Sequence, residues 1–463
     1  MPSTFGPLQL GLSGLQAQQI GLDVTGQNVA NVNTPGYNRQ EAVLTDSPPT
    51  PNTPGELGTG VTVAQITQAR DTFVNQQFRN QQSGLSQWQA AQNGLNEIQA
   101  IYNEPSATAI SGVLSQFWSS LQQLAGNPES LATRTTVAQQ GQNLASSINT
   151  VYSKLQDLQG NLNNQVGAIV QQVNTDASQI AALNGEIEAV TGGGQTANDL
   201  ISQRANLLDQ LSKLTGVQVT QETNGSVQVD SGGGTLVFGS TAHSLAAVTP
   251  TGSNLSRVVW GASGVAFNTA AGGQLAGTIT LRDTTIPGLQ SQLNTFAANL
   301  ASEMNTLQQN GYALNANSPS GINFFNVTAG SEAASIAVNP AVTADPTQIA
   351  AASNPSAPGD GSNAQNMADL ATTTVPALGN SSVGDYYNAT ISGLGIQAQT
   401  ANQMVTNGQA LVTQMTNQRQ AVSGVSLDQE ATNLVTYQQA YGAAADFINT
   451  VNTLLNTLIQ TVG

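Results

Sequence analysis

The sequence predicts a mainly α-helical protein with a β-rich insertion, in which the N- and C-terminal helices pair as a coiled coil. Three patterns lead to this prediction: apolar heptads at both ends, long helical periodicities between them, and a switch to period-two alternation near the centre. A single amphipathic helix cannot bury its own apolar row. Because neither end has an adjacent hydrophobic partner, we expect the two ends to pack together.

The predicted units are nested along the chain. We assign residues 1–45 plus 411–463 to a terminal coiled-coil inner domain and residues 46–215 plus 283–410 to a helical-bundle middle domain. Residues 216–282 form a small β-rich outer domain inserted near the centre. A chain of 463 residues has room for these units.

The first expected helix covers Leu8–Asn31. Glycines recur within it, and each costs about 1 kcal/mol relative to alanine in a helix, so this segment needs a partner in order to fold. The apolar residues that we expect to face the partner are Leu8, Leu12, Leu15, Leu22 and Val29.

A turn ends this helix. Thr34-Pro35-Gly36-Tyr37 fits a type II turn, in which proline takes the second position and glycine supplies the positive φ of the third. The following stretch, Ser47–Gly60, is rich in proline and glycine and is interpreted as an extended connector.

Helical periodicity dominates the middle of the chain. Asn198–Leu214 is an amphipathic pattern followed by Gly216, which is the kind of residue that ends a helix. Gly311–Gly384 looks irregular, and helix is expected from near Tyr386 to the C-terminus with a break at Ser423-Gly424. The other helical patterns span Phe78–Tyr102, Leu131–Ile187 and Pro287–Asn310.

Period-two alternation begins at Val217. Valines on both sides of Asn224-Gly225 predict a β-hairpin, because this dipeptide favours tight turns with positive φ. Further short strands are expected through Thr278–Leu281.

The C-terminal segment carries the clearest heptad. A helix over Ser426–Ile459 would be about 50 Å long at 1.5 Å per residue. Two rows with a seven-residue spacing form its predicted seam. The first row is Leu427, Leu434, Tyr441, Ile448 and Leu455, and the second is Tyr437, Ala444, Val451 and Leu458.

Composition excludes several classes of function. Only 8% of the residues are charged and the net charge is −16, which argues against binding to nucleic acids or anionic membranes. The absence of cysteine excludes disulfides and thiolate metal sites. The first basic residue is Arg39 and no apolar run reaches 18 residues, so we expect neither a cleaved signal peptide nor a transmembrane helix.

No motif predicts catalysis, a metal site or a cofactor. His243 is the single histidine, and no nucleophile-elbow sequence accompanies it. Gly192-Gly193-Gly194 and Gly232-Gly233-Gly234 lack the residues that complete a phosphate-binding loop, so flexible loops are the simpler interpretation. We therefore expect the chain not to be an enzyme.

Two terminal segments resemble bacterial flagellar axial proteins, which include rod, hook and hook-associated proteins. The N-terminal signature, Asn28–Tyr37, contains Asn31, Thr34, Pro35, Gly36 and Tyr37, and Arg39-Gln40 follow it. The C-terminal segment resembles the FlgK family, whose members join the hook to the filament. Its matching residues are Ser423–Glu430 and Tyr437–Tyr441, and Ala334–Ala352 and Gly361–Leu370 also resemble this family.

The resemblance implies a mechanism and partners. It implies a structural subunit of the hook–filament junction that assembles helically with copies of itself, with hook protein below and the next hook-associated protein above. It also implies an extracellular location, reached unfolded through flagellar type III export without a cleaved signal, and a cytoplasmic chaperone on the C-terminal helix. Two alternatives remain: a hook or rod subunit, and a secreted coiled-coil adhesin or enzyme with flagellar-type ends.

Overall fold

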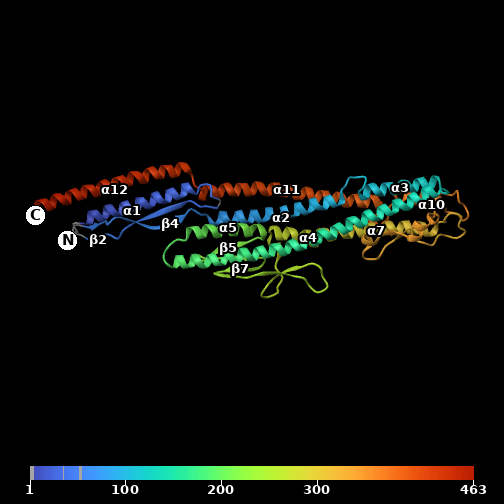
Figure 1. Ribbon diagram of the computed structural model, residues 1–463, viewed down its shortest axis with the longest axis horizontal. Coiled ribbons are helices and arrows are strands. Elements are labelled where there is room, and N and C mark those ends of the chain that lie inside the picture. Colours follow the sequence, from blue (N-terminus) through green and yellow to red (C-terminus); the bar gives the residue numbers. More distant parts are fainter. Residues whose placement is uncertain (1–4, 35, 52–54, 463) are drawn as a thin grey trace.

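The computed structural model describes residues 5–34, 36–51 and 55–462. These residues form a long, narrow molecule, with a pair of terminal helices at one end and a helical bundle at the other (Figure 1). Short strands lie along one side of the middle. The predicted class, mainly helical with small antiparallel sheets, is confirmed.

The two ends of the chain pack against each other. Helix α1 spans Gly6–Ala30 and α12 spans Leu427–Val462. Contacts run from Gly11 to Ile448 and from Gly21 to Tyr437, so the helices are antiparallel. The N-terminal end of α1 and the C-terminal end of α12 therefore lie at the same tip of the molecule (Figure 1).

A β-hairpin follows α1. Strands β1 (Gln40–Asp46) and β4 (Val61–Gln68) pair antiparallel and pack against α1. The expected connector lies between these strands, and its described residues carry the short pair β2 (Thr50–Pro51) and β3 (Glu56–Leu57). The two long strands of this hairpin did not stand out in the sequence.

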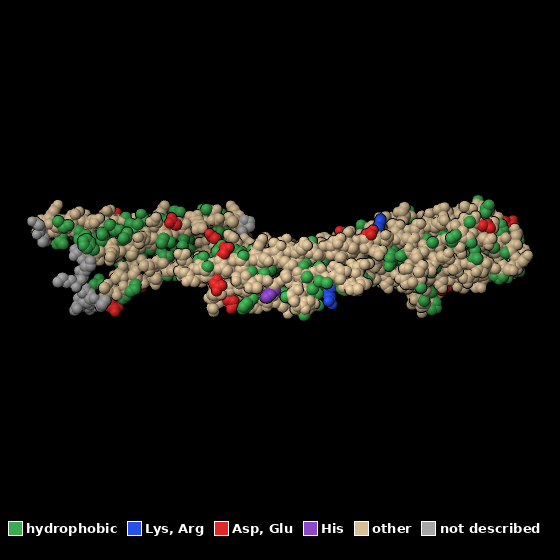
Figure 2. Space-filling model, turned by 60° about the horizontal axis from the view of Figure 1, so that its bottom comes forward, with side chains coloured by type: hydrophobic (Ala, Val, Ile, Leu, Met, Phe, Trp, Pro, Cys, Tyr) green, Lys and Arg blue, Asp and Glu red, His purple; other side chains and the backbone are tan. Residues whose placement is uncertain are grey.

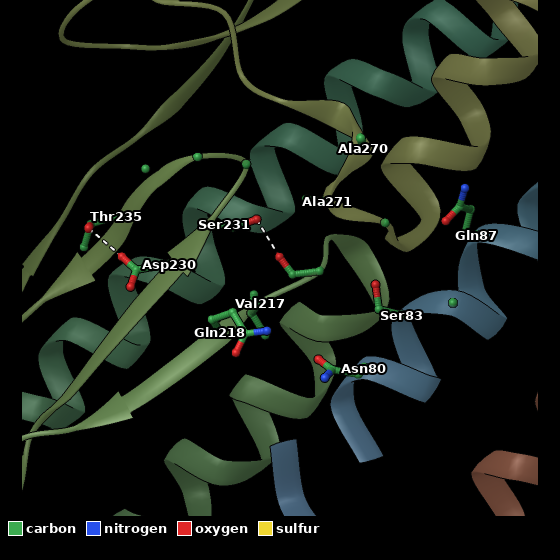
Figure 3. Close-up of a pocket in the computed structure, with 16 residues that line it drawn as sticks. Asn80, Ser83, Gln87, Val217, Gln218, Asp230, Ser231, Thr235, Ala270 and Ala271 are labelled. Atoms are coloured by element: carbon green, nitrogen blue, oxygen red, sulfur yellow. Dashed lines mark hydrogen bonds between the residues drawn. The ribbon is translucent and has the colours of Figure 1, made fainter. Parts of the chain in front are cut away.

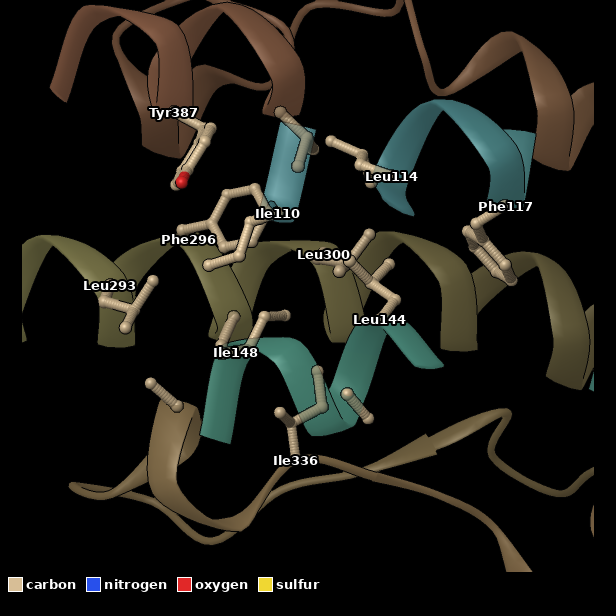
Figure 4. Packing of buried hydrophobic residues seen from close by; sticks show 14 of the residues in the cluster. Ile110, Leu114, Phe117, Leu144, Ile148, Leu293, Phe296, Leu300, Ile336 and Tyr387 are labelled. Carbon is tan, nitrogen blue, oxygen red and sulfur yellow. The ribbon is translucent and has the colours of Figure 1, made fainter. Parts of the chain in front are cut away.

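From its middle to the end opposite the terminal helices, the molecule is a helical bundle around one large core. Side-chain caps start three of its helices, because Asp71, Ser130 and Ser382 each accept a backbone N–H of the first turn. Figure 4 shows Phe296 and Leu300 packed against Ile110, Leu144 and Tyr387 in this core. The bundle helices are α2 (Thr72–Tyr102), α3 (Ile110–Gly126), α4 (Leu131–Gly192), α7 (Ile286–Asn310) and α11 (Val383–Ser423). Helix α5 (Asn198–Leu214) packs on a second core through Leu208 and Leu211.

Helix α4 connects two hydrophobic cores. Its 62 residues include Leu144–Leu162, which face the large core, and Val166–Ala181, which face a second core beneath the strands. One continuous helix therefore joins the bundle to the β-rich region.

The β-rich region is a four-stranded antiparallel sheet and a separate hairpin. Gly225 has φ +87° in the loop between β5 and β6, as the predicted Asn224-Gly225 turn requires. The sheet order is β5 (Gln218–Gln221), β6 (Val227–Ser231), β7 (Gly234–Phe238) and β8 (Thr241–Ala242), and the hairpin is β9 (Leu245–Val248) with β10 (Arg257–Trp260).

The strand predicted at Thr278–Leu281 is wrong. This segment lies in helix α6 (Gly273–Thr280) and the π-helical turn Leu281–Thr285, after the 3₁₀ turn Thr269–Ala271. Helix α6 packs closely against α2, where a Cβ on Gly277 would lie 2.4 Å from the carbonyl oxygen of Gln87. This packing overrides the strand preference of Thr278 and Ile279, since β-propensity depends strongly on context.

Residues 311–382 lie at the end of the bundle farthest from the terminal helices and are largely irregular, as predicted. Arg134, 1% exposed, donates hydrogen bonds to the carbonyl oxygens of Pro128, Thr347 and Ile349 and so holds this segment to α4. The short elements are β11 (Phe325–Asn326), α8 (Glu332–Ser335), β12 (Ala337–Val338), α9 (Pro340–Ala344), Pro346–Gln348, α10 (Ser362–Asp369) and Pro376–Leu378.

Candidate assembly interface

The seam between α1 and α12 consists of small residues on one side and larger ones on the other. A Cβ on Gly11 would lie 2.6 Å from Ile448 Cγ1, and one on Gly21 would lie 2.7 Å from Tyr437 Cε1. The two glycines therefore let these side chains approach the α1 backbone. The buried residues of α1 are Gly11, Ala17, Gly21, Val24, Thr25 and Asn28.

The five apolar residues predicted for the partner-facing side of α1 do not lie at the centre of this seam. Leu12 and Val29 are 49% and 39% exposed. Leu8, Leu15 and Leu22 are half-buried beside the glycines. Leu12 and Val29 therefore lie outside the centre of the α1–α12 pair, because helices approach most closely where side chains are smallest. That these five residues face an assembly partner stays a prediction.

The predicted rows of α12 lie partly in the seam. Leu427 and Leu458 are 53% and 50% exposed, and Tyr441 is 36% exposed, so these three lie outside the buried centre. Tyr437, Ala444 and Ile448 lie against glycines of α1. The other members of the two rows are Leu434 and Leu455, which are half-buried, and Val451, which is buried.

Much of the outer surface of the pair is apolar. Hydrophobic side chains gather over α1 and α12, at the left of the view in Figure 2. On α12, Leu454 and Ile459 are 65% and 68% exposed. Further exposed members are Leu10, Val435 and Phe447. Exposed apolar patches of this kind mark protein interaction sites.

The signature turn is built around Asn28. Its side chain donates to the carbonyl oxygen of Gln40 at 2.9 Å and accepts the N–H of Gln40 at 2.9 Å, as a neighbouring strand would. The hydroxyl of Tyr37 also donates to Asn28 Oδ1 at 2.9 Å. Burial, followed by the negative charges of Asp199 and Glu430, raises the pKa of Tyr37 to about 12.

The other signature residues shape the turn. Thr34 Oγ1 donates to Asn31 Oδ1, and the N–H of Tyr37 donates to the carbonyl oxygen of Thr34 at 3.1 Å. Gly36 has φ +78°, and a Cβ there would collide with Asn206 of α5. These features fit the predicted type II turn. Pro35 lies outside the described residues.

Two segments connect the terminal pair to the bundle: residues 36–39, which follow α1, and residues 423–426, from the end of α11 to the start of α12. We call these two segments the joint. Helix α11 ends at Ser423, at the predicted break, and the carbonyl oxygen of Ser423 accepts the N–H of Arg39 at 2.9 Å. A groove of about 530 Å³ separates residues 32–39 from residues 416–429. Glu430, 1% exposed, lies next to this joint. It is seven residues before Tyr437, so the heptad spacing could have identified it as a seam position.

Sequence reasoning missed an ionic cluster beside the joint. Asp209 of α5 accepts hydrogen bonds from Arg79 of α2 at 2.9 Å and from Arg419 of α11 at 2.6 Å. The guanidinium of Arg419 also lies 4.6 Å from the ring centroid of Phe78, a cation–π contact. The residues lie 130 and 210 positions apart, so no local pattern could predict this cluster.

A crevice beside the β-rich region gives no sign of a catalytic constellation. It has a volume of about 660 Å³, lies between α2 and the β-rich region, and is lined mostly by glycine, serine and amide side chains (Figure 3). Its single carboxylate, Asp230, accepts hydrogen bonds from Thr235 and Gln228. His243 lies on the surface (Figure 2).

The described part of the chain contains neither a cluster that could hold a metal ion nor a helix that could cross a membrane. Among those residues, no group of three or more His, Asp or Glu side chains could hold a metal ion. Within the same residues, no helix is both long enough and apolar enough to cross a bilayer.

Three family models match the chain. Residues 95–325 match the flagellar hook-associated protein FlgK helical domain. Residues 8–38 match the flagella basal body rod protein family, and residues 416–461 match the C-terminal region of the basal body rod proteins FlgEFG. The last two matches coincide with α1 and its turn and with most of α12.

Similarity to known proteins extends over the whole chain. Flagellar hook-associated protein 1 of Bacillus subtilis is 30% identical over 511 aligned residues, which cover 100% of this chain and 99% of that protein. The Escherichia coli protein of the same name is 27% identical and covers 97% of this chain and 98% of its own length.

The fold is also known. The flagellar hook junction protein FlgK from Burkholderia pseudomallei aligns with a TM-score of 0.65 and 18% identity, over 75% of this chain and 100% of that structure. Because the sequence similarity covers the full length at 30% identity, the chain belongs to the family of flagellar hook-associated protein 1, FlgK.

Proposed function

We propose that this chain forms the junction between hook and filament in the bacterial flagellum, where copies of it pack side by side at the hook tip. Membership of the hook-associated protein 1 family supports the structural role in motility. One observation carries the packing: the paired terminal helices expose apolar side chains on their outer face, including Leu454, Leu458 and Ile459.

The exposed residues would be covered by neighbouring copies. Leu12, Leu427 and Tyr441 lie outside the α1–α12 seam, so they are available for contacts with another molecule. A polymer that grows from such contacts is heterologous, since one face meets a different face on the next copy. The hook protein would lie below this layer and the next hook-associated protein above it.

The same surface supports two further proposals. Before export, a cytoplasmic chaperone would cover the apolar face of α12, because an unpaired helix with this composition is prone to aggregate. Export would take the unfolded chain through the flagellar type III route without a cleaved signal. Glycine-rich α1 is consistent with this, because it depends on α12 for its stability.

Deletion of the gene tests the junction role. We expect finished hooks without filaments on the cell surface, and flagellin in the medium. Electron microscopy and an assay of flagellin in the culture supernatant provide the measurements. Loss of the hooks would instead favour a rod or hook subunit, and motile cells would contradict both roles.

A pair of seam substitutions tests the packing. Leu434→Asp with Ile448→Asp charges the seam, so we expect folded central domains but no incorporation at the hook tip. The control, Gln438→Glu with Asn452→Asp, adds the same charge at two exposed positions of α12. Normal incorporation of the seam variant, measured by immunogold labelling, would refute the pairing model.

A further inference from the structure

Charge is distributed very unevenly along this chain. It has 26 acidic and 10 basic residues, and neither residues 1–38 nor residues 420–463 contain a lysine or arginine. Within α1 and α12, three carboxylates are exposed: Asp23, Asp428 and Asp446. The terminal helix pair is therefore apolar and acidic, with no cation of its own.

Four of the eight arginines lie together at the joint. We call Arg70, Arg79, Arg204 and Arg419 the arginine cluster; Asp209 is the carboxylate that attracts Arg70 and bonds to Arg79 and Arg419. Arg204 donates instead to Asn184 and to the carbonyl oxygen of Gly225. Burial, and then the proximity of Arg70 and Arg79, lowers the pKa of Arg204 to about 10.

Arg70 is the member of the cluster whose hydrogen-bonding groups have the fewest partners. Its Nε atom is buried and has no hydrogen-bond partner, and its side chain is otherwise partly exposed. Burial lowers the pKa of Arg70, as do Arg79 and Arg419, whereas Asp209 raises it. A buried charged group without a full set of hydrogen bonds is costly.

The cluster can be reached from outside. The side chain of Arg419 is 24% exposed. Arg419 also lines the groove at the joint, together with Arg39 and the start of α12. Arg39 is paired with Glu41 and Arg419 with Asp209, so an anion in this groove would meet the exposed part of the Arg419 side chain and the positive end of the α12 dipole.

We propose that the arginine cluster binds a carboxylate from the terminal helix pair of a second copy of this chain, namely Asp23, Asp428 or Asp446. The inference rests on the proposed assembly of copies at the hook tip. It gives the acidic, cation-free helix pair a partner of opposite charge. It also brings a carboxylate to the exposed part of the Arg70 side chain, although not to its buried Nε atom. Charge complementarity of this kind fixes register and partner choice between subunits.

Cross-linking tests the contact directly. Because the chain has no cysteine, single cysteines can be introduced without background. Two variant forms would be co-expressed with the wild-type chain. One form carries Arg70→Cys, and the other carries Asp23→Cys, Asp428→Cys or Asp446→Cys. Hooks isolated from these cells would then be treated with a short bismaleimide cross-linker. We expect a covalent dimer for at least one pair, and none when Arg257→Cys, an exposed arginine on β10, replaces Arg70→Cys.

The outcomes separate the two proposals. The inference would be overturned if hooks that contain both variant chains gave no dimer for any of the three carboxylate positions, either with Arg70→Cys or with Arg419→Cys. That result would leave the junction role intact. Absence of wild-type chain from the hook tip would instead refute the proposed function. A cross-link from Arg70→Cys to another flagellar protein would show that the partner is not a second copy.

A stability measurement distinguishes assembly from folding. We expect Arg70→Met to leave the melting temperature of the monomer unchanged or higher, because it removes a poorly paired charge. Occupancy of hook tips should fall about tenfold. A lower melting temperature with normal occupancy would mean that Arg70 stabilises only the fold, and would contradict the proposal.

Discussion

Asn28 connects the end of α1 to the start of β1. Its side-chain amide forms two hydrogen bonds with the backbone of Gln40 and accepts a third from Tyr37, while only 1% of the residue is exposed. The two backbone groups of Gln40 are buried and would otherwise have no bond to Asn28, whereas Tyr37 is partly exposed. The turn therefore depends on a short polar side chain that has both a donor and an acceptor.

Replacing Asn28 tests this connection. We expect Asn28→Ala to lower the local unfolding free energy of β1 and β4 by about 2–4 kcal/mol, because the buried N–H of Gln40 loses its acceptor. Asn31→Ala is the control, since Asn31 bonds in an exposed position and should cost less than about 1 kcal/mol. Hydrogen exchange of the strand amides measures both, and equal effects would argue against a special role of Asn28.

Tyr37 makes this region sensitive to alkaline pH. The folded protein holds the phenol proton up to a pKa of about 12, whereas the unfolded chain releases it near pH 10. The stabilisation from Tyr37 is therefore complete below pH 10 and is lost as the pH rises toward 12. Unfolding of wild type and Tyr37→Phe across this range should show a shrinking difference in stability, and a constant difference would contradict the prediction.

At the scale of elements, α1 and α12 depend on each other in different ways. Helix α12 supplies large side chains, and α1 supplies glycines that receive Ile448 and Tyr437. Glycine weakens an isolated helix but permits a close interhelical approach. The terminal pair is therefore stable only as a pair, which suits helices that later become part of a larger assembly.

Two glycine substitutions on α1 should have opposite effects. Gly21→Ala places a Cβ 2.7 Å from the ring of Tyr437, so we expect the pair to lose about 1–3 kcal/mol. Gly26→Ala has no atom within 4 Å of its new Cβ and should stabilise α1 by up to about 1 kcal/mol. Exchange rates of α12 amides report on both variants, and a stabilising Gly21→Ala would refute the close packing.

At the scale of the whole molecule, stability is concentrated away from the termini. The two hydrophobic cores lie in the bundle and beneath the strands, and α4 runs through both. The terminal pair contributes to neither core and exposes apolar surface instead. A molecule built in this way can keep a folded body while its ends respond to neighbouring subunits.

Hydrogen exchange on the free monomer tests this distribution. We expect fast exchange in Leu8–Val29 and slow exchange in the helices of the bundle, because a two-helix pair buries little surface. Assembly at the hook tip should slow exchange in the ends, since binding to the folded form stabilises it by mass action. Strong protection of Leu8–Val29 in the monomer would contradict this expectation.

Local patterns in the sequence determined much of the architecture. The bounds of α5, the break at Ser423-Gly424 and the hairpin at Asn224-Gly225 follow from periodicity and from the backbone preferences of single residues. The heptads at both ends indicated that the termini need helical partners. The signature residues from Asn28 to Tyr37 indicated the family.

Only the tertiary structure decided which residues meet. It placed the glycines of α1, rather than Leu12 and Val29, in the centre of the terminal pair, and it made Thr278–Leu281 helical against α2. It also brought Asp209 to Arg79 and Arg419. The physical reason is that periodicity records which face of an element is apolar, whereas close approach and charge pairing depend on partners far away in the chain.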